Sequence, residues 1–269
     1  MSVPPLVNTA NVKTEVENNV AWITIDHEER LNAFDLATQT DLTAAFRACG
    51  GDPSIGAVVL TGAGDRAFCA GGYLKDLAEP DLNQLHQLFL GTVELVNAIR
   101  QIRQPVIAAV NGYAMGGGNE LVIACDFAVA SDKAILGQTG PRIGSAPVVG
   151  GTNMLTLMIG EKRAKEVSFL CRKYTAAQAL EMGWINEVAP HDQLRTRVRA
   201  WCDEVLALSP RYLEIAKVSS NYWWDLLQPG FSHGARLLAA SAGSEEMLEG
   251  ARAFVEKRKP DFMQFRKRK

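Results

Sequence analysis

The chain has few of the residues that build metal centres and disulfide frameworks. Its 269 residues include five cysteines and four histidines. The cysteines are odd in number and scattered, and none shows the paired spacing that is typical of a zinc site. This pattern argues against a disulfide framework and a metal site, and it predicts a reducing, cytoplasmic environment.

Long apolar runs and a strong charge imbalance are lacking as well. No run of about 18 apolar residues occurs, and the first residues do not follow the basic-then-apolar pattern of a secretory signal. Lys and Arg number 28 against 30 Asp and Glu, which gives a formal net charge of -2. We therefore expect no membrane span, no secretion and no electrostatic attraction to nucleic acid.

Short apolar runs alternate with amphipathic patterns through the first half of the chain. Hydrophobic residues make up 47% of the sequence, which is enough for a sizeable core. Strands that are apolar on both faces and separated by helices predict an α/β fold with a largely parallel sheet. The expected strands are Val12–Val16, Val20–Ile25, Ala57–Thr61, Val106–Val110, Phe127–Ala130 and Ile135–Thr139, and the expected helices are Leu36–Cys49, Leu82–Arg103 and Gly118–Cys125.

The pattern changes after Gly151, where helical periodicity dominates. We therefore expect an α/β core over residues 1–200 and a helical C-terminal region over residues 201–269. The later helical patterns are Met154–Met158, Lys162–Leu170, Ala176–Met182, Leu194–Leu208 and Arg211–Leu227.

Two turns rich in small residues carry the strongest chemical signal. In Asn111-Gly-Tyr-Ala-Met-Gly-Gly-Gly-Asn-Glu120, three glycines follow an apolar run and precede a helical pattern, so their backbone N–H groups are unobstructed. Ala67-Phe-Cys-Ala-Gly-Gly-Tyr-Leu-Lys75 also follows an apolar run and ends in small residues. Two N–H donors and the carboxylate of Glu120 are the groups that enolate or acyl chemistry needs.

Each glycine turn on its own also fits a plain structural role, as a tight turn between a strand and a helix. Gly62-Ala-Gly-Asp-Arg-Ala67 matches the loose dinucleotide-binding pattern, but no helix opens after it. A pyrophosphate needs that helix N-terminus, so a nicotinamide or flavin enzyme is disfavoured.

Taken together, the two turns resemble the halves of the oxyanion hole of the crotonase superfamily, the enoyl-CoA hydratase and isomerase family. The resemblance extends from about Val12 to Lys259. It implies a crotonase-like spiral of ββα units, a helical C-terminal part that mediates assembly into a trimer or hexamer, and an acyl-CoA substrate with no separate cofactor. By motif position, the amides of Gly72 and Gly117 would hold the thioester carbonyl, and Glu120 would be the catalytic acid or base.

One expected catalytic residue is missing. The segment from Gly137 to Thr152 is similar to the hydratase loop that carries a second glutamate, but it places Gly140 at that position. Loss of one proton carrier is expected to slow ordinary hydration, and a glutamate restored at position 140 is expected to raise it.

Two segments, Gln138-Thr-Gly-Pro141 and Leu170-Cys-Arg-Lys-Tyr174, are similar instead to segments of naphthoyl-CoA synthases and ring-opening ketoacyl-CoA hydrolases. In the synthases a bicarbonate can replace the missing carboxylate, so the resemblance implies a possible small-anion site at Gln138, Thr139 and Gly140. The chain departs from that branch at Pro147 and Ser168, and in having Glu120. Tyr73, His86 and Asp76 are candidates for a substitute acid.

The resemblance also implies where CoA would bind. Arg30 matches the family's basic residue in the first ligand-contacting loop, where a cation would meet phosphate. Further contacts with CoA are expected from Ala33, Ala70, Leu74, Phe254 and Lys257.

We therefore expect a cytoplasmic enoyl-CoA hydratase of fatty acid metabolism. The first alternative is an isomerase, or a hydrolase or cyclase that acts on a ring-bearing acyl-CoA. The second alternative is a non-catalytic relative that binds RNA, which the near-neutral charge disfavours.

Overall fold

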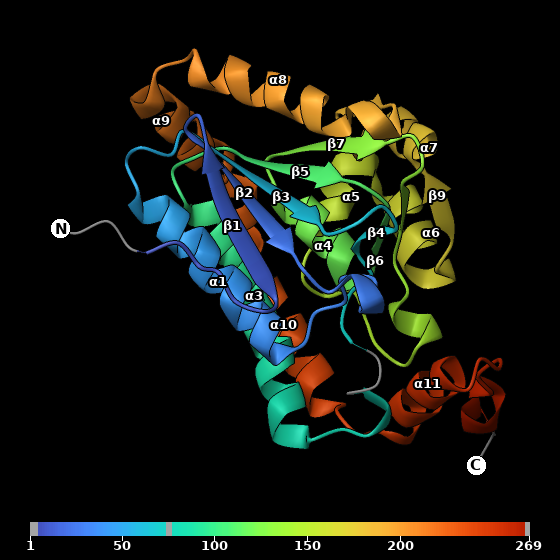
Figure 1. Cartoon of the computed structure of the whole chain (residues 1–269). Coiled ribbons are helices and arrows are strands. Elements are labelled where there is room, and N and C mark those ends of the chain that lie inside the picture. The colour runs from blue at the N-terminus through green and yellow to red at the C-terminus, as the bar shows by residue number, and fades with distance from the viewer. Residues whose placement is uncertain (1–4, 74–76, 267–269) are drawn as a thin grey trace.

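Two β-sheets form the centre of the computed structural model, which describes residues 5–73 and 77–266 (Figure 1). In the larger sheet the strand order is β1-β2-β3-β5-β7-β10, and in the smaller sheet it is β4-β6-β8-β9. The β1–β2 and β8–β9 pairs are antiparallel and the other pairs are parallel. The larger sheet consists of β1 (Val12–Glu17), β2 (Val20–Ile25), β3 (Ala57–Gly62), β5 (Val106–Val110), β7 (Phe127–Ser131) and β10 (Glu187–Ala189), and the smaller of β4 (Ala67–Cys69), β6 (Tyr113–Met115), β8 (Ile135–Gly137) and β9 (Lys173–Thr175).

Helices cover both faces of the larger sheet because its strands are apolar on both sides. On one face, Val59, Ile107 and Val129 pack with α8, which lies across the sheet in Figure 1. On the other face, Leu60 and Ala108 belong to the core that contains α1 and α3. The helices are α1 (Leu36–Gly51), α3 (Leu82–Gln101), α4 (Gly117–Ala124), α5 (Met154–Ile159), α6 (Glu161–Leu170), α7 (Ala176–Glu181), α8 (Leu194–Leu206), α9 (Pro210–Ser220), α10 (Tyr222–Ala240) and α11 (Glu245–Val255), with 3-10 turns η1 (Glu28–Arg30), η2 (Gly140–Arg142), η3 (His191–Gln193) and η4 (Phe262–Arg266).

The local signals of the first half of the chain are confirmed. The hairpin of β1 and β2 has Asn18 and Asn19 at positive φ in its turn. The side chain of Asp35 caps α1 by accepting a hydrogen bond from the Thr38 N–H, as its place before an amphipathic run predicts. The sequence pattern therefore locates the hairpin, α1 and the helix α4 that follows the second glycine turn.

Other expectations require correction. The prediction of a single helix over Arg211–Leu227 is wrong. Helix α9 ends at Ser220 and α10 begins at Tyr222, with Asn221 between them. The strand expected over Ile135–Thr139 ends at Gly137. The strands β4, β6, β9 and β10 were not expected, because three residues are too few to show the alternation of a strand. The domain boundary placed between residues 200 and 201 falls inside α8 and stays a prediction.

In the described part of the chain, no helix has both the length and the apolar character required to cross a bilayer.

Candidate active site

A cavity of about 380 Å³ lies where the smaller sheet meets α4 and the loop before α5. Its described lining includes Gly72, Gly117 and Glu120, together with Gln138 and Gly140. Larger grooves of about 790 and 810 Å³ run along α1 and α3, but no predicted catalytic residue lines them. The cavity therefore brings together the residues that the sequence singled out for chemistry.

The two glycine turns touch each other at this cavity. A Cβ atom placed on Gly71 would lie 3.1 Å from the Gly117 nitrogen and 2.8 Å from the Met115 oxygen. Gly71 has a φ of +95°, a conformation that only glycine adopts readily. The parallel pairing of β4 with β6 places the ends of both strands at the same edge of the sheet, and the turns follow these ends.

Both predicted donors have N–H groups that the backbone does not use. Gly117 is the first residue of α4, so its N–H has no acceptor within the helix. Beside Gly72, the chain forms an isolated parallel bridge to Phe34, in which Phe34 donates to Gly71 and Tyr73 donates to Phe34. Because successive N–H groups of an extended chain alternate in direction, the Gly72 N–H faces away from that bridge.

Close packing accounts for the glycine triplet. A Cβ atom on Gly117 would lie 2.8 Å from Cζ of Phe34, and one on Gly118 would overlap the Cys69 oxygen. Gly116 caps α4 with a φ of +55°. The triplet lets the N-terminus of α4 approach both β4 and the Phe34 ring, and the positive end of the helix dipole then faces the cavity.

Glu120 lies in the first turn of α4 and is held by the loop before α5. Its Oε1 accepts hydrogen bonds from the backbone N–H of Val149 at 2.8 Å and of Gly151 at 3.3 Å. Only 6% of the residue surface is exposed. Burial raises the pKa of Glu120 to about 7, and the two hydrogen bonds offset only part of that rise. A carboxyl group with such a pKa is suited to exchange protons near neutral pH.

A buried amide stands near this acid without a protein partner. Gln138 is fully buried, and neither polar atom of its side chain finds a hydrogen-bond partner within the described residues. A Cβ atom on Gly151 would lie 2.7 Å from Gln138 Nε2, so the amide packs against the segment that holds Glu120. An unpaired buried amide is unfavourable, and this one belongs to a residue of the cavity lining close to the segment that holds Glu120.

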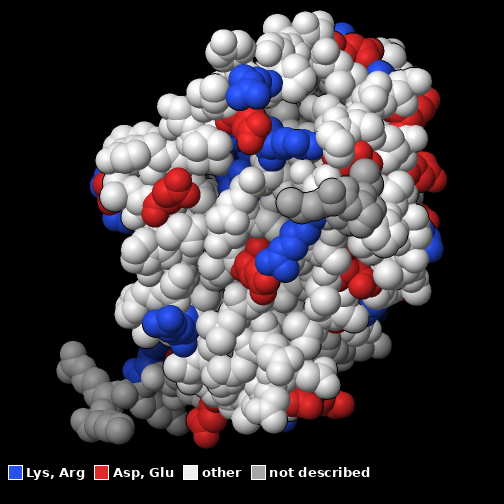
Figure 2. Space-filling view, turned by 90° about the vertical axis from the view of Figure 1, so that its left-hand side faces the viewer, with Lys and Arg blue, Asp and Glu red and all other residues white. Residues whose placement is uncertain are grey.

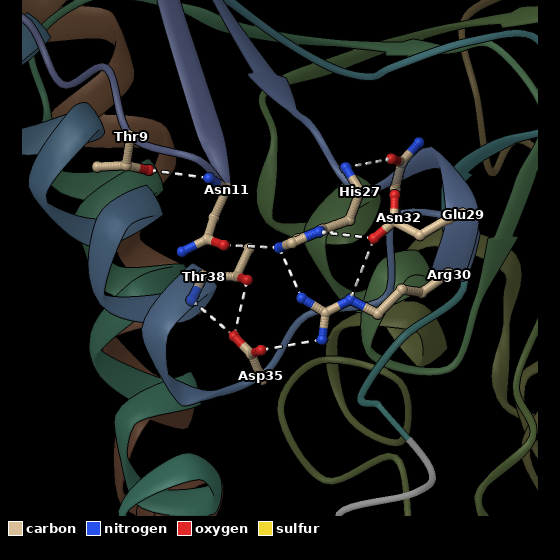
Figure 3. A network of polar contacts seen from close by, with 8 residues as sticks. All are labelled: Thr9, Asn11, His27, Glu29, Arg30, Asn32, Asp35 and Thr38. Atoms are coloured by element: carbon tan, nitrogen blue, oxygen red, sulfur yellow. Dashed lines mark hydrogen bonds and ion pairs between the residues drawn. The ribbon is translucent and has the colours of Figure 1, made fainter.

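Arg30, the predicted phosphate contact, is engaged within the protein (Figure 3). Its Nη1 donates to Asp35 Oδ2 at 3.0 Å, its Nη2 lies 2.6 Å from His27 Nε2, and its guanidinium stacks on the Tyr73 ring at 4.7 Å. Burial opposes ionisation of Asp35, but hydrogen bonds from Thr38 and Arg30 hold its pKa below the usual value. The Arg30 side chain is 18% exposed and does not line the cavity.

Of the other predicted CoA contacts, two line the cavity and two do not. Ala70 and Phe254 line the cavity, with Phe254 reaching it from α11. Ala33 is buried, Lys257 is exposed in the turn that follows α11, and neither belongs to the lining. Leu74 lies outside the described residues. The roles of these residues stay predictions.

The candidate substitute acids lie elsewhere. His86 is exposed on α3, where its Nδ1 lies 3.2 Å from the Leu82 oxygen, and Tyr73 packs under Arg30. Neither lines the cavity, and Asp76 lies outside the described residues. Across residues 5–73 and 77–266, no group of His, Cys, Asp and Glu side chains could hold a metal ion.

Several lining residues were not foreseen from the sequence. Phe34 packs against the Gly117 turn, while Tyr113, Arg142 and Lys173 stand at the rim. No local pattern identifies Tyr113 and Lys173, because β6 and β9 are three residues long and pair through β8.

Known proteins are similar to this chain in sequence and in fold. The family model described as "Enoyl-CoA hydratase/isomerase" matches residues 15–266. A crystal structure of an enoyl-CoA hydratase from Mycobacterium avium subsp. paratuberculosis has a TM-score of 0.84 at 27% identity, covering 96% of this chain and 99% of that chain. For an enoyl-CoA hydratase from Bacillus anthracis, the TM-score is 0.77 at 32% identity, with 93% and 98% of the two chains covered.

The chain belongs to the enoyl-CoA hydratase/isomerase family, an enzyme family that acts on acyl-CoA substrates. The resemblance to the crotonase superfamily is confirmed, and so is the expected α/β fold.

Proposed function

We propose that the protein is an enoyl-CoA hydratase, which adds water across the 2,3 double bond of an enoyl thioester. The observation that carries this proposal is the convergence of the Gly72 and Gly117 turns with Glu120 on one cavity. The family and its solved structures support the coarser assignment to acyl-CoA chemistry.

In the proposed reaction, the N–H groups of Gly72 and Gly117 bind the thioester oxygen and stabilise the negative charge that develops there as an enolate. A donor of this kind typically contributes about 3 kcal/mol in the transition state. Glu120 takes a proton from water while the hydroxyl bonds to C3, and the resulting carboxylic acid returns that proton to C2. Its pKa of about 7 suits both directions of transfer.

The cavity wall also supports an acyl substrate. The lining includes the apolar side chains of Leu88, Phe89, Val149 and Leu238, against which a hydrocarbon chain would be removed from water. On the opposite side of the thioester, we propose that CoA passes over Ala70, close to Ala33. Arg30 would contribute by fixing the η1 loop and Tyr73 rather than by a free cation at the cavity.

The test is turnover of a panel of 2-enoyl-CoA esters of differing chain length by the purified protein. We expect loss of the conjugated double bond and formation of the 3-hydroxyacyl ester. Glu120→Gln should lower kcat about a hundredfold or more while binding of CoA esters is retained. An unchanged rate in this variant, or no turnover of any ester by the wild type, would refute the proposal.

An isomerase is the second candidate, because Glu120 is the single carboxylate in the described cavity lining. One carboxylate can remove a proton from C2 of a 3-enoyl ester and return it to C4, whereas hydration by the two-glutamate mechanism needs a second acid. A 3-enoyl-CoA substrate distinguishes the two, since an isomerase forms the conjugated 2-enoyl ester. The ring-acting alternative would require turnover of an alicyclic ketoacyl-CoA.

A small anion is a further element of the proposal. The unpartnered amide of Gln138, the Thr139 side chain and the N–H of Gly140 at the start of η2 would fit a bicarbonate-sized ion. Bound there, bicarbonate would supply a second group able to accept and donate protons. Dependence of the rate on added bicarbonate tests this.

We also propose a trimer or hexamer. The helices α9 and α10 expose large apolar side chains that a monomer would leave in contact with water. They include Tyr212, Ile215, Val218, Tyr222, Trp223 and Leu226, each at least 54% exposed. Sedimentation of the purified protein at several concentrations would establish the number of subunits.

We place the activity in the cytoplasm and in fatty acid metabolism. An RNA-binding role is disfavoured by the formal net charge of -2. On the face shown in Figure 2, Lys and Arg are scattered among Asp and Glu.

A further inference from the structure

Two cationic side chains at the cavity rim have no carboxylate partner among the described residues. Arg142 and Lys173 are the cations of the described lining, and Glu120 is its acid. The Lys173 ammonium lies 5.4 Å from the centroid of the Tyr113 ring and makes no ion pair with a described residue. The aromatic face orients the ammonium without neutralising its charge.

Arg142 is fixed at the same rim by the chain that leads into β9. Its Nη2 donates to the Cys171 oxygen at 2.9 Å and lies 3.4 Å from the Leu170 oxygen. Its remaining guanidinium N–H groups make no hydrogen bond within the described residues, so they are available to a ligand. Two positive groups therefore lie beside one cavity, and no described residue supplies a negative charge that pairs with either of them.

The order of the smaller sheet places Lys173 on one particular side of the thioester site. Gly72 follows β4 at one edge, and Lys173 belongs to β9 at the opposite edge. Between these edges, Gly137 of β8 pairs with both Met115 and Lys173, and its carbonyl accepts the Gly116 N–H at 3.0 Å. The edges are separated by three strand spacings, or about 14 Å.

This placement separates the acyl group from the CoA arm. The thioester carbonyl, bound by Gly72 and Gly117, would lie near the ends of β4 and β6. The sulfur and the acyl carbon leave the carbonyl on opposite sides, and the proposed CoA path follows Ala70, which comes directly after β4. The side toward β8 and β9, with Lys173, is then the side of the acyl group.

We propose that Lys173, assisted by Arg142, binds a carboxylate at the far end of the acyl group, so that the preferred substrates are thioesters of dicarboxylic acids. This inference rests on the proposed acyl-CoA function. The apolar residues of the lining would hold the hydrocarbon part, and the Lys173 ammonium would pair with the terminal carboxylate. A charge-assisted contact at a partly enclosed rim corresponds to about a tenfold preference for the ester that ends in a carboxylate over the ester that ends in a methyl group.

The test compares 2-enoyl thioesters of equal chain length that end in a methyl group or in a carboxylate, such as 2-octenoyl-CoA and 2-octenedioyl-CoA. The measured quantity is the ratio of their kcat/KM values. We expect the wild type to favour the carboxylate ester about tenfold or more, Lys173→Met to remove that preference, and Lys173→Arg to keep most of it. Lys162→Met, at an exposed site of α6, is the matched control and should leave the ratio unchanged.

A second arm separates the acyl carboxylate from the phosphates of CoA. The same acyl groups are tested as N-acetylcysteamine thioesters, which lack the nucleotide. The preference and its loss in Lys173→Met should persist with these esters. Equal loss for methyl and carboxylate CoA esters, with no effect on the short thioesters, would assign Lys173 to phosphate and overturn the inference.

Binding keeps this test independent of turnover. Dissociation constants of octanoyl-CoA and octanedioyl-CoA, which cannot react, are measured by calorimetry for the wild type and the three variants. The carboxylate preference should appear in binding even if the protein catalyses a reaction other than hydration. Equal affinities of the wild type for both ligands would refute the role of Lys173, whatever the reaction is.

Discussion

The backbone N–H of Val149 donates a hydrogen bond to Oε1 of Glu120 at 2.8 Å, and so joins the loop before α5 to the first turn of α4. Both this N–H and that of Gly151 need an acceptor, which the carboxylate provides in either protonation state. A glutamine can offer its Oε1 to the same donors. Glu120→Gln therefore removes the proton exchange while it retains the local hydrogen bonds.

The rate of water addition should depend on the ionisation of Glu120. Because burial raises its pKa to about 7, the base form of the free enzyme increases as the pH rises through that value. We expect kcat/KM for an enoyl-CoA to rise between about pH 6 and pH 8 and then level off. Stopped-flow measurement across this range checks the midpoint, and a profile that falls toward high pH would assign the essential form to the protonated acid.

The same group links stability to pH. A carboxyl group whose folded pKa exceeds its ordinary value of 4.5 contributes most at low pH, and its contribution is lost as the pH rises toward 7. Relative to the wild type, Glu120→Gln should gain about 3 kcal/mol in its free energy of unfolding between about pH 4 and pH 8. Denaturant unfolding at both pH values measures this change, and a constant difference between the two proteins would contradict it.

The two proposed oxyanion glycines should respond differently to alanine. A Cβ atom on Gly117 would lie 2.8 Å from the Phe34 ring, whereas one on Gly72 would meet no heavy atom within 4 Å. Gly117→Ala should therefore lower both stability, by about 1–3 kcal/mol, and kcat, because the ring or the turn must move. Gly72→Ala should fold normally and act on catalysis alone, by obstructing the ligand side of the turn.

Thermal unfolding and steady-state kinetics of both variants provide the check. Retention of full activity by both would exclude these amides as the donors to the thioester oxygen.

Much of the fold was predictable where neighbouring residues determine the structure. Asp35 caps α1 three residues before its hydrogen-bond donor Thr38, and the glycine triplet directly precedes the helix that carries Glu120. These signals lie within one helical turn. The sequence therefore predicted α1, α4 and the positions of the two glycine turns along the chain, but not the short strands β4, β6 and β9.

Contacts between distant segments could not be predicted in the same way. The donors to Glu120 are 29 and 31 residues away, and Lys173 reaches Tyr113 only because β8 lies between their strands. Arg30 was assigned to phosphate from its position, but the ion pair with Asp35 depends on how η1 folds back onto α1. Such pairings follow from sheet order and loop geometry, which no local pattern encodes.

A buried charge cluster joins α3, the start of β7 and α9. Lys217, with 5% of its side chain exposed, lies 2.7 Å from Asp126, and Arg100 lies 3.8 Å from the same carboxylate. Asp126→Asn would leave two buried cations without their counter-charge, and should lower the free energy of unfolding by about 3–5 kcal/mol.

The matched control is the exposed Lys165–Glu161 pair on α6, where Glu161→Gln should change stability by less than about 1 kcal/mol. Urea unfolding of the two variants measures the contrast. Similar effects at both sites would show that water reaches the Asp126 cluster.

The structure reverses the expectation for a glutamate at position 140. A Cβ atom on Gly140 would lie 2.8 Å from the Ala146 Cα and 2.9 Å from the Ser145 oxygen, and both are backbone atoms that cannot rotate away. Gly140→Glu should therefore displace the loop that lines the cavity, lower stability by about 1–3 kcal/mol and reduce hydration rather than raise it. Gly230→Ala, at a helical site with no heavy atom within 4 Å, is the control and should be neutral or slightly stabilising. Crotonyl-CoA hydration and thermal unfolding are measured for both. A stable and more active Gly140→Glu protein would mean that the loop can move aside, and that this position can still accept a second catalytic acid.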